Sequence, residues 1–233
     1  KVDFISQQEF KQYFPKSGWV EHDPDEIWDS VLYVCKDVMK KAQITGKNIV
    51  SLGISNQRET TVIWHKKTGK AIHNAIVWQD RRTSDICNEL RSNNHEAMIA
   101  KKTGLLLDPY FSATKIKWVL DNVDGARTMA EKGDLLFGTV DTYLIYMLSK
   151  EKNHFTDVTN ASRTLLFNIK TMDWDDDLLE LFDIPKSMMP NVLACDDNFG
   201  TLSIKEHDIP IRGVIGDQQA ALVGQDCFKE GDM

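Results

Sequence analysis

Polar residues suited to binding a small hydroxylated molecule follow two apolar stretches of the chain. Arg58 and Glu59 come directly after NIVSLGISNQ, and Asp217 comes directly after GVIG. An arginine donates hydrogen bonds and a carboxylate accepts them, so Arg58 and Glu59 could together hold a polyol. Asp217, placed between an expected strand and an expected helix, could act as a general base that takes a proton from a hydroxyl.

Each of these residues also has a purely structural interpretation. Asp217 could be the N-cap of a helix, and Gln218 could be an ordinary residue of its first turn. Arg58 and Glu59 could form an exposed ion pair, which contributes little to stability. The local sequence leaves both interpretations open.

Two aromatic residues could complete such a pocket. Trp78, followed by the polar run at 79–82, offers an apolar wall beside polar groups, as a small-ligand site requires. Tyr110 lies in a turn before an expected helix and could present its hydroxyl to a ligand. Trp78 could equally be a core tryptophan, and Tyr110 could simply pack. The acidic run at 173–177 is interpreted as helix N-terminal charge and solvated surface.

Composition excludes several classes of protein. The net charge of −7 argues against a nucleic-acid binder, which needs a basic face. The standard nucleotide loops and the H-E-x-x-H zinc motif are missing from the sequence. Its four cysteines form no C-x-x-C pair and are expected to be free thiols in a reducing cytosol. No apolar run approaches the roughly 20 residues of a membrane span, so we expect a cytoplasmic protein.

The elements that must position these residues alternate between strands and helices. The helix expected from Pro24 has Asp23 as its N-cap, with Glu26 three residues later. Other helices are expected around 82–92, 95–102, 112–122, 139–149 and 174–182, and strands at 2–10, 48–54 and 213–216. Thr68-Gly69 predicts a hairpin turn. This alternation predicts an α/β domain, in which ligands gather at the carboxyl ends of strands.

Longer stretches of the chain resemble the glycerol kinases within the FGGY family of carbohydrate kinases, in that family's order and at about its spacing. The stretches are GWVEHDPDEIW, SNQRETTVIWHKKTGKAIHNAIVWQDRRT, TGLLLDPYFSATKIKWVLDN, DVTNASRTLLFNI, DWDDDLLELFDIP and GDQQAALVGQ. The resemblance implies a ribonuclease H-like (actin-like ATPase) fold, with a mixed sheet flanked by helices. It also implies ATP-dependent phosphorylation of glycerol to sn-glycerol 3-phosphate.

The resemblance further implies roles for individual residues. Glycerol would be bound by Arg58, Glu59, Trp78, Tyr110, Asp217 and Gln218. Asp217 would be the catalytic base and would help to hold Mg²⁺ through water. Glycerol and ATP would be the partners, and the full-length enzyme would form a homo-oligomer.

The resemblance also sets expectations about domain organisation. Residues 1–233 are expected to be the N-terminal, substrate-binding domain, without the opening phosphate-binding hairpin and without the C-terminal nucleotide-binding domain. The main ATP site would then lie outside this chain, and the chain alone would be inactive. Two alternatives remain: a pentulose kinase of the same family, and a non-catalytic actin-like binding module.

Overall fold

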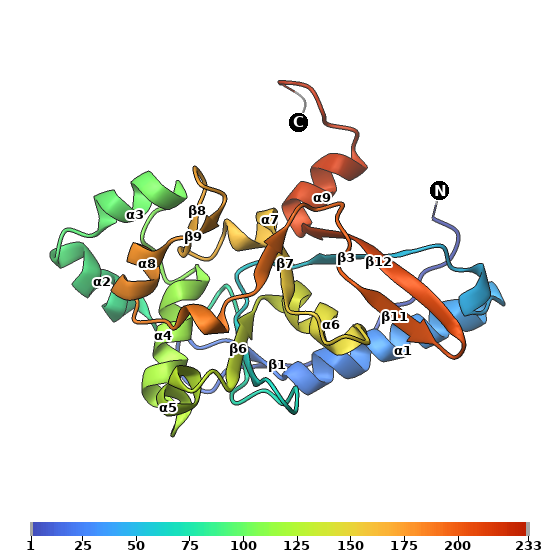
Figure 1. The fold of residues 1–233 in the computed structure, drawn as a ribbon, viewed down its shortest axis with the longest axis horizontal. Coiled ribbons are helices and arrows are strands. Elements are labelled where there is room, and N and C mark those ends of the chain that lie inside the picture. The colour runs from blue at the N-terminus through green and yellow to red at the C-terminus, as the bar shows by residue number, and fades with distance from the viewer. Residues whose placement is uncertain (1, 232–233) are drawn as a thin grey trace.

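The computed structural model describes residues 2–231, which form several small sheets, one of them mixed, with helices packed around them (Figure 1). The α-helices are α1 (Pro24–Ala42), α2 (Ser84–Ser92), α3 (Glu96–Thr103), α4 (Ser112–Asn122), α5 (Ala126–Glu131), α6 (Val140–Leu148), α7 (Val158–Ala161), α8 (Asp176–Leu181) and α9 (Asp217–Gly224). The strands are β1 (Gln12–Tyr13), β2 (Glu21–His22), β3 (Leu52–Asn56), β4 (Val62–His65), β5 (Ala75–Ile76), β6 (Leu135–Gly138), β7 (Phe155–Asp157), β8 (Phe167–Asn168), β9 (Asp173–Trp174), β10 (Asn191–Leu193), β11 (Thr201–Ile204) and β12 (His207–Gly216). Short 3₁₀ turns lie at Gly46–Asn48 and Lys186–Met188.

Strand β12 is the middle strand of the sheet that carries the site residues. It pairs in parallel with β3 and antiparallel with β11, so the sheet is mixed, as predicted. Apolar side chains of α1 and α6 pack against this sheet, among them Ile27 and Ile145, which contact the cluster around Ile54 and Val214. Burial of these side chains fixes both helices against the sheet through the hydrophobic effect.

A second and larger apolar cluster lies beside the first. It gathers side chains from α2 to α5 and α8 around β4 and β6, with Ile116, Phe137 and Phe182 completely or almost completely buried. Figure 1 shows these helices grouped at one end of the molecule, with the β11–β12–β3 sheet at the other. The loop that leaves β3 therefore runs from one apolar cluster toward the other.

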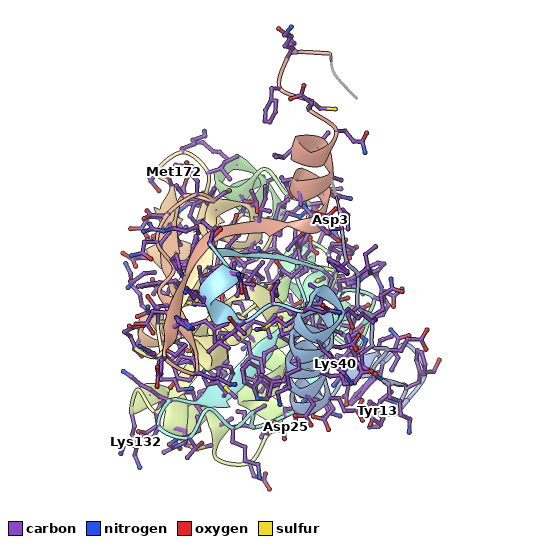
Figure 2. The ribbon with its side chains drawn as sticks, turned by 90° about the vertical axis from the view of Figure 1, so that its right-hand side faces the viewer. Asp3, Tyr13, Asp25, Lys40, Lys132 and Met172 are labelled. Atoms are coloured by element: carbon purple, nitrogen blue, oxygen red, sulfur yellow. The ribbon has the colours of Figure 1, made fainter. Side chains whose placement is uncertain are left out.

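Helix α1 begins where its capping residues predict. The Asp23 carboxylate accepts a hydrogen bond from the Asp25 N–H at 2.8 Å, and Pro24 is the first helical residue. Glu26 does not complete a capping box: its carboxylate binds the Tyr13 hydroxyl at 2.6 Å and the Lys11 N–H at 3.0 Å. These two hydrogen bonds tie the N-terminal segment to α1, and Figure 2 labels Tyr13 in the same view as Asp25 and Lys40 of that helix.

Most predicted helices are confirmed. Helix α4 has the predicted bounds, and α2, α3, α6 and α8 differ from theirs by at most two residues at either end. The hairpin turn is also confirmed, because the Gly69 N–H donates to the His65 carbonyl at 2.8 Å and Trp64 bridges to Ala71.

Two strand predictions need correction. The strand expected at 2–10 is wrong: the segment has no regular secondary structure and pairs with no strand among residues 2–231, and Val2, Phe4 and Ile5 are exposed. Alternating apolar residues favour a strand only when a neighbour accepts its backbone hydrogen bonds. The stretch at 48–54 is predicted as a buried strand. Strand β3 instead begins at Leu52 and ends at Asn56, and only Ile54 and Asn56 in it are buried.

Candidate functional site

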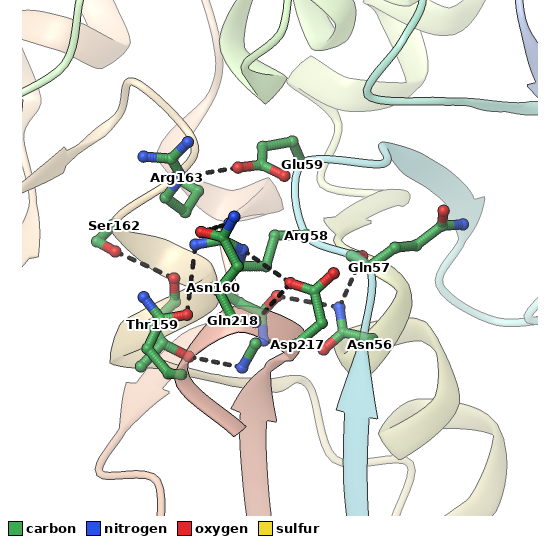
Figure 3. A network of polar contacts seen from close by, with 12 residues as sticks. Asn56, Gln57, Arg58, Glu59, Thr159, Asn160, Ser162, Arg163, Asp217 and Gln218 are labelled. Carbon is green, nitrogen blue, oxygen red and sulfur yellow. Dashed lines mark hydrogen bonds and ion pairs between the residues drawn. The ribbon is translucent and has the colours of Figure 1, made fainter. Parts of the chain in front are cut away.

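The candidate site lies at the carboxyl ends of β3 and β12. The parallel register places Gly216 opposite Asn56, so both strands end at the same level of the sheet. Arg58 follows one strand and Asp217 follows the other, and Figure 3 shows these two side chains facing each other. This is the edge at which open α/β sheets bind their ligands.

Arg58 is the buried centre of this group, with only 4 % of its surface exposed. Its Nη2 donates to Gln218 Oε1 at 2.6 Å, and its Nη1 donates to Gln219 Oε1 at 3.3 Å. Its Nε lies 3.2 Å from Asp217 Oδ1, but the orientation leaves Nε without a hydrogen bond among the described residues. The alternative of an exposed Arg58–Glu59 ion pair is therefore wrong.

Gly216 makes the close approach of Arg58 possible. A Cβ atom at this position would lie 2.4 Å from Arg58 Cδ and 2.8 Å from Arg58 Cγ. Real Cβ contacts are not that short, so only glycine lets the arginine stem pass against the end of β12. No site residue was predicted at Gly216, because the contact joins segments that are distant in the sequence.

Asp217 is the first residue of α9, and Gly216 occupies the N-cap position. The alternative that Asp217 is a helix N-cap is therefore wrong. Its Oδ1 accepts the Gln218 N–H at 2.8 Å and faces Arg58, and the side chain is 54 % exposed. One oxygen is thus held by the protein, while the exposed part of the carboxylate is open to a hydroxyl group.

Glu59 is buried, although it lies beside Arg58 in the sequence. Its side chain is turned to Arg163, whose Nε donates to Glu59 Oε1 at 2.7 Å. Burial raises the pKa of Glu59, and Arg163 works in the opposite direction. The Glu59 backbone has φ of 60°, a left-handed conformation that is uncommon for residues other than glycine. This turn sends Arg58 and Glu59 to different partners.

The two predicted aromatic residues lie together. The rings of Trp78 and Tyr110 have centroids 5.5 Å apart, and the Arg163 guanidinium lies 5.8 Å from the Tyr110 ring centroid. Burial raises the pKa of Tyr110, and the nearby Glu59 carboxylate raises it further. Trp78 is half-buried and so is not a fully enclosed core residue. Tyr110 packs partly against the larger apolar cluster and also borders the polar group through Arg163.

Two of the charged residues after Trp78, Asp80 and Arg82, bind partners near β2. Asp80 accepts the Val20 N–H at 2.6 Å, and the Arg82 guanidinium lies 3.8 Å from the ring centroid of Trp19 and 4.6 Å from that of Trp118. Arg82 also binds Asp80 and Glu21. Asp80 and Arg82 thus hold the segment around β2 in place, so these two members of the run at 79–82 do not line the site.

Sequence reasoning missed a polar framework beneath the site. The side-chain amides of Asn56 and Asn160 donate to each other at 3.0 and 3.1 Å (Figure 3). Asp157 caps α7, and Thr159 Oγ1 accepts the Gly216 N–H at 2.8 Å. Helix α7 therefore joins the ends of β3 and β12. Arg163 follows this helix. The only signal for it in the sequence is a positive charge next to several polar residues.

The described residues contain no group of three or more His, Cys, Asp or Glu side chains placed to hold a metal ion. Mg²⁺ prefers oxygen ligands and often keeps several waters while binding one or two carboxylates. The exposed carboxylate of Asp217 fits such a water-mediated role, so the predicted contribution to Mg²⁺ binding stays a prediction.

Two further predictions concern the state of the cysteines and the presence of a membrane-spanning segment. Cys35, Cys87, Cys195 and Cys227 are free thiols. Within residues 2–231, no helix combines the length and the apolar character needed to cross a membrane.

Comparison with known proteins places this site in a family. Residues 1–224 match the model of the FGGY family of carbohydrate kinases, N-terminal domain. Glycerol kinase 1 of Pseudomonas aeruginosa is 57% identical over 227 residues, which cover 97% of this chain and 46% of the relative. A glycerol kinase of Geobacillus sp. is 56% identical, with 99% of this chain and 47% of the relative covered. The chain thus spans about half the length of the curated relatives it matches.

Solved structures agree with these relatives. The crystal structure of Plasmodium falciparum glycerol kinase with ADP superposes with a TM-score of 0.91 at 38% identity, covering 97% of this chain and 46% of that one. A ligand-bound xylulose kinase from Lactobacillus acidophilus is 22% identical and superposes with a TM-score of 0.82. The match covers 94% of this chain and 44% of the xylulose kinase chain, and the two share the fold. These likenesses confirm the predicted ribonuclease H-like, actin-like ATPase fold class. The chain belongs to the FGGY family of carbohydrate kinases.

Proposed function

We propose that the protein carrying this chain transfers the γ-phosphoryl group of ATP to glycerol, giving sn-glycerol 3-phosphate. The observation that carries the proposal is the meeting of Arg58, Asp217 and Gln218 at one sheet edge, with buried Glu59 beside them. Identities of 55 to 57% to proteins named glycerol kinase support the choice of substrate.

The proposed site matches the chemistry of glycerol. Glycerol is well hydrated, so a site must replace its water hydrogen bonds with fixed donors and acceptors. Arg58 would donate to its hydroxyls, Glu59 and Asp217 would accept from them, and Gln218 and Tyr110 would add further polar contacts. Trp78 would cover the carbon atoms.

Asp217 is proposed as the general base. A hydroxyl of glycerol would lose its proton to the exposed carboxylate as the oxygen attacks phosphorus. Phosphoryl transfer depends mostly on alignment and charge stabilisation, which Mg²⁺ and ATP-binding residues would supply when bound. Asp217 would then orient water around the metal, and its Oδ1 would stay fixed by the Gln218 N–H.

The remaining parts of the proposal rest on the family resemblance. The chain would be the substrate-binding domain, with the main ATP site formed by residues outside it. The protein would act in the cytoplasm as a homo-oligomer.

Substitution of Asp217 tests the proposed chemistry. In the natural protein that carries this sequence, Asp217→Asn should lower kcat about 10²- to 10⁴-fold, because the amide cannot accept the proton. Glycerol-dependent ADP release, followed in a coupled assay, measures the effect. The thermal midpoint of the variant should match that of the parent, which separates lost chemistry from lost structure.

The choice of substrate is tested in the same assay. Glycerol should support much faster ADP release than xylulose in the parent protein. A preference for xylulose would replace the proposal with the pentulose kinase alternative. Saturation-transfer NMR with glycerol on the 233-residue chain, with Arg58→Ala as control, tests binding separately from turnover. A parent protein that neither binds nor phosphorylates glycerol would overturn the proposal.

A further inference from the structure

Helix α4 carries a lysine that is completely enclosed behind the candidate site. Lys115 has 0 % exposure, and no carboxylate of the described residues lies within ion-pair distance of its ammonium group. Its Nζ instead donates to two backbone carbonyls, those of Tyr110 at 2.5 Å and Glu59 at 3.3 Å. Both carbonyls belong to residues of the proposed glycerol site.

Burial of the charged Lys115 side chain costs free energy of folding, because the ammonium group loses its hydration. Burial lowers the pKa of Lys115 to about 7, with Arg82 acting in the same direction. Glu59, Asp80 and Asp108 partly oppose this shift through their charges. An apolar side chain of similar volume would fill the position without the desolvation penalty. The two carbonyl contacts therefore need a reason other than stability.

The first contact holds the turn that separates Arg58 from Glu59. The Glu59 carbonyl accepts hydrogen bonds from Lys115 Nζ, from Ser112 Oγ at 3.1 Å and from Thr61 Oγ1 at 3.3 Å. Glu59 has the left-handed φ of 60°, a conformation that persists only where the surroundings fix it. Donors from α4 thus hold the backbone in the shape that directs Arg58 toward Asp217 and Glu59 toward Arg163.

The second contact holds the segment that carries Tyr110. Because the same ammonium group binds the Tyr110 carbonyl, it joins this segment to the turn at Glu59. Tyr110 lies against Trp78 on one side and near Arg163 on the other. The apolar wall and the carboxylate of the site are thereby held at a fixed separation.

We propose that Lys115 is a positioning residue for the polyol site, which sets the separation of Glu59 and Tyr110 through their backbone carbonyls and so sets the affinity for glycerol. This inference rests on the proposed function. Lys115 itself does not touch the ligand in this arrangement.

Lys115→Met is the decisive variant, because methionine keeps the length and apolar stem but has no donor. In the natural protein, KM for glycerol should rise on the order of 10- to 100-fold, since displacement of a positioning group by about 1 Å costs up to about 10²-fold. KM for ATP should stay within about twofold of the parent value. The thermal midpoint should change little, because removal of the buried charge stabilises the variant and loss of the two hydrogen bonds to carbonyls destabilises it.

Lys102→Met is the matched control. Lys102 lies on α3 and pairs with Asp175 and Asp177, away from the site. The KM of the Lys102→Met variant for glycerol should equal that of the parent. A folded Lys115→Met protein with an unchanged KM for glycerol would overturn the inference while leaving the proposed function intact. A parent protein without activity on glycerol would overturn both.

A second variant covers the case in which Lys115→Met does not fold. Ser112→Ala removes another donor to the Glu59 carbonyl and leaves Lys115 in place. It should raise KM for glycerol by a smaller factor, with KM for ATP unchanged. If neither KM moves in Ser112→Ala, the Glu59 turn does not control the site and the inference fails.

Discussion

The ammonium of Lys115 gives the protein an unusual dependence of stability on pH. Its pKa is about 7 in the folded chain, against 10.5 for an ordinary lysine. Between these values the unfolded chain binds one more proton than the folded chain, so the free energy of unfolding rises with pH across that window. The slope from this one group is at most about 1.4 kcal/mol per pH unit.

The difference between the parent and Lys115→Met isolates this effect. We expect the stability of the variant relative to the parent to be highest at pH about 6.5 and to fall steadily toward pH about 9.5. Urea unfolding at several pH values measures both proteins. Glu59, Asp80, Asp108 and Arg82 face the lysine and are present in both. A difference that did not change with pH would show that Lys115 is not desolvated as described.

The site residues that the sequence made predictable are those that follow the ends of strands. Asp217 directly follows an apolar stretch, and Arg58 ends a short polar run after another, and this local signal needs no knowledge of the partner. Arg163 and Lys115 gave no such signal. Arg163 reaches Glu59 across 104 positions of the sequence, and Lys115 looks like one polar residue in an amphipathic helix until its burial is known.

At the scale of elements, the junction between β12 and α9 depends on Gly216. We expect Gly216→Ala to raise KM for glycerol strongly, because the added Cβ would displace Arg58 from its position beside Asp217. Overpacking of this kind also destabilises a protein by about 1–3 kcal/mol. Steady-state kinetics with glycerol and thermal unfolding measure the two effects.

Gly224→Ala provides the comparison within the same helix. A Cβ at Gly224 would meet nothing within 4 Å, so this variant should keep the parent KM. Its stability should be equal or slightly higher, since alanine favours helix over glycine. Equal kinetics for the two glycine variants would mean that Arg58 does not need the space beside Gly216.

Elements with a clear period or a clear cap were predictable, and short buried strands were not. Helix α1 combines an apolar stripe with the Asp23 cap, and both signals agree. Strand β6 is buried at all four of its positions, so it shows no alternation that would distinguish it from a helix segment. The segment at 2–10 shows the reverse error, since it has an apolar pattern but no partner strand among the described residues.

At the scale of the whole molecule, the site lies where the two apolar clusters meet. Arg58 and Glu59 lie between β3, which packs with one cluster, and β4, which contributes to the other. Tyr110 packs against the larger cluster, and Asp217 follows β12 of the smaller one. A ligand bound by all of them would hold both clusters together.

We therefore expect glycerol to stabilise the fold. At a concentration of about 100 times its Kd, it should add about 2.7 kcal/mol to the free energy of unfolding. Thermal unfolding with millimolar glycerol measures the shift. Arg58→Ala should show none, which separates specific binding from the general solvent effect of a polyol. An equal shift in both proteins would contradict binding at this site.

The Arg58 guanidinium has one more consequence, because only two of its five N–H groups have acceptors within residues 2–231. Gln218 and Gln219 each accept from one terminal nitrogen, whereas Nε has no hydrogen bond among the described residues. A buried donor without an acceptor costs free energy. A glycerol hydroxyl would supply the missing acceptor. A diol that lacks this hydroxyl would leave the donor unpaired, so the protein would reject such a near-analogue through its own unsatisfied group.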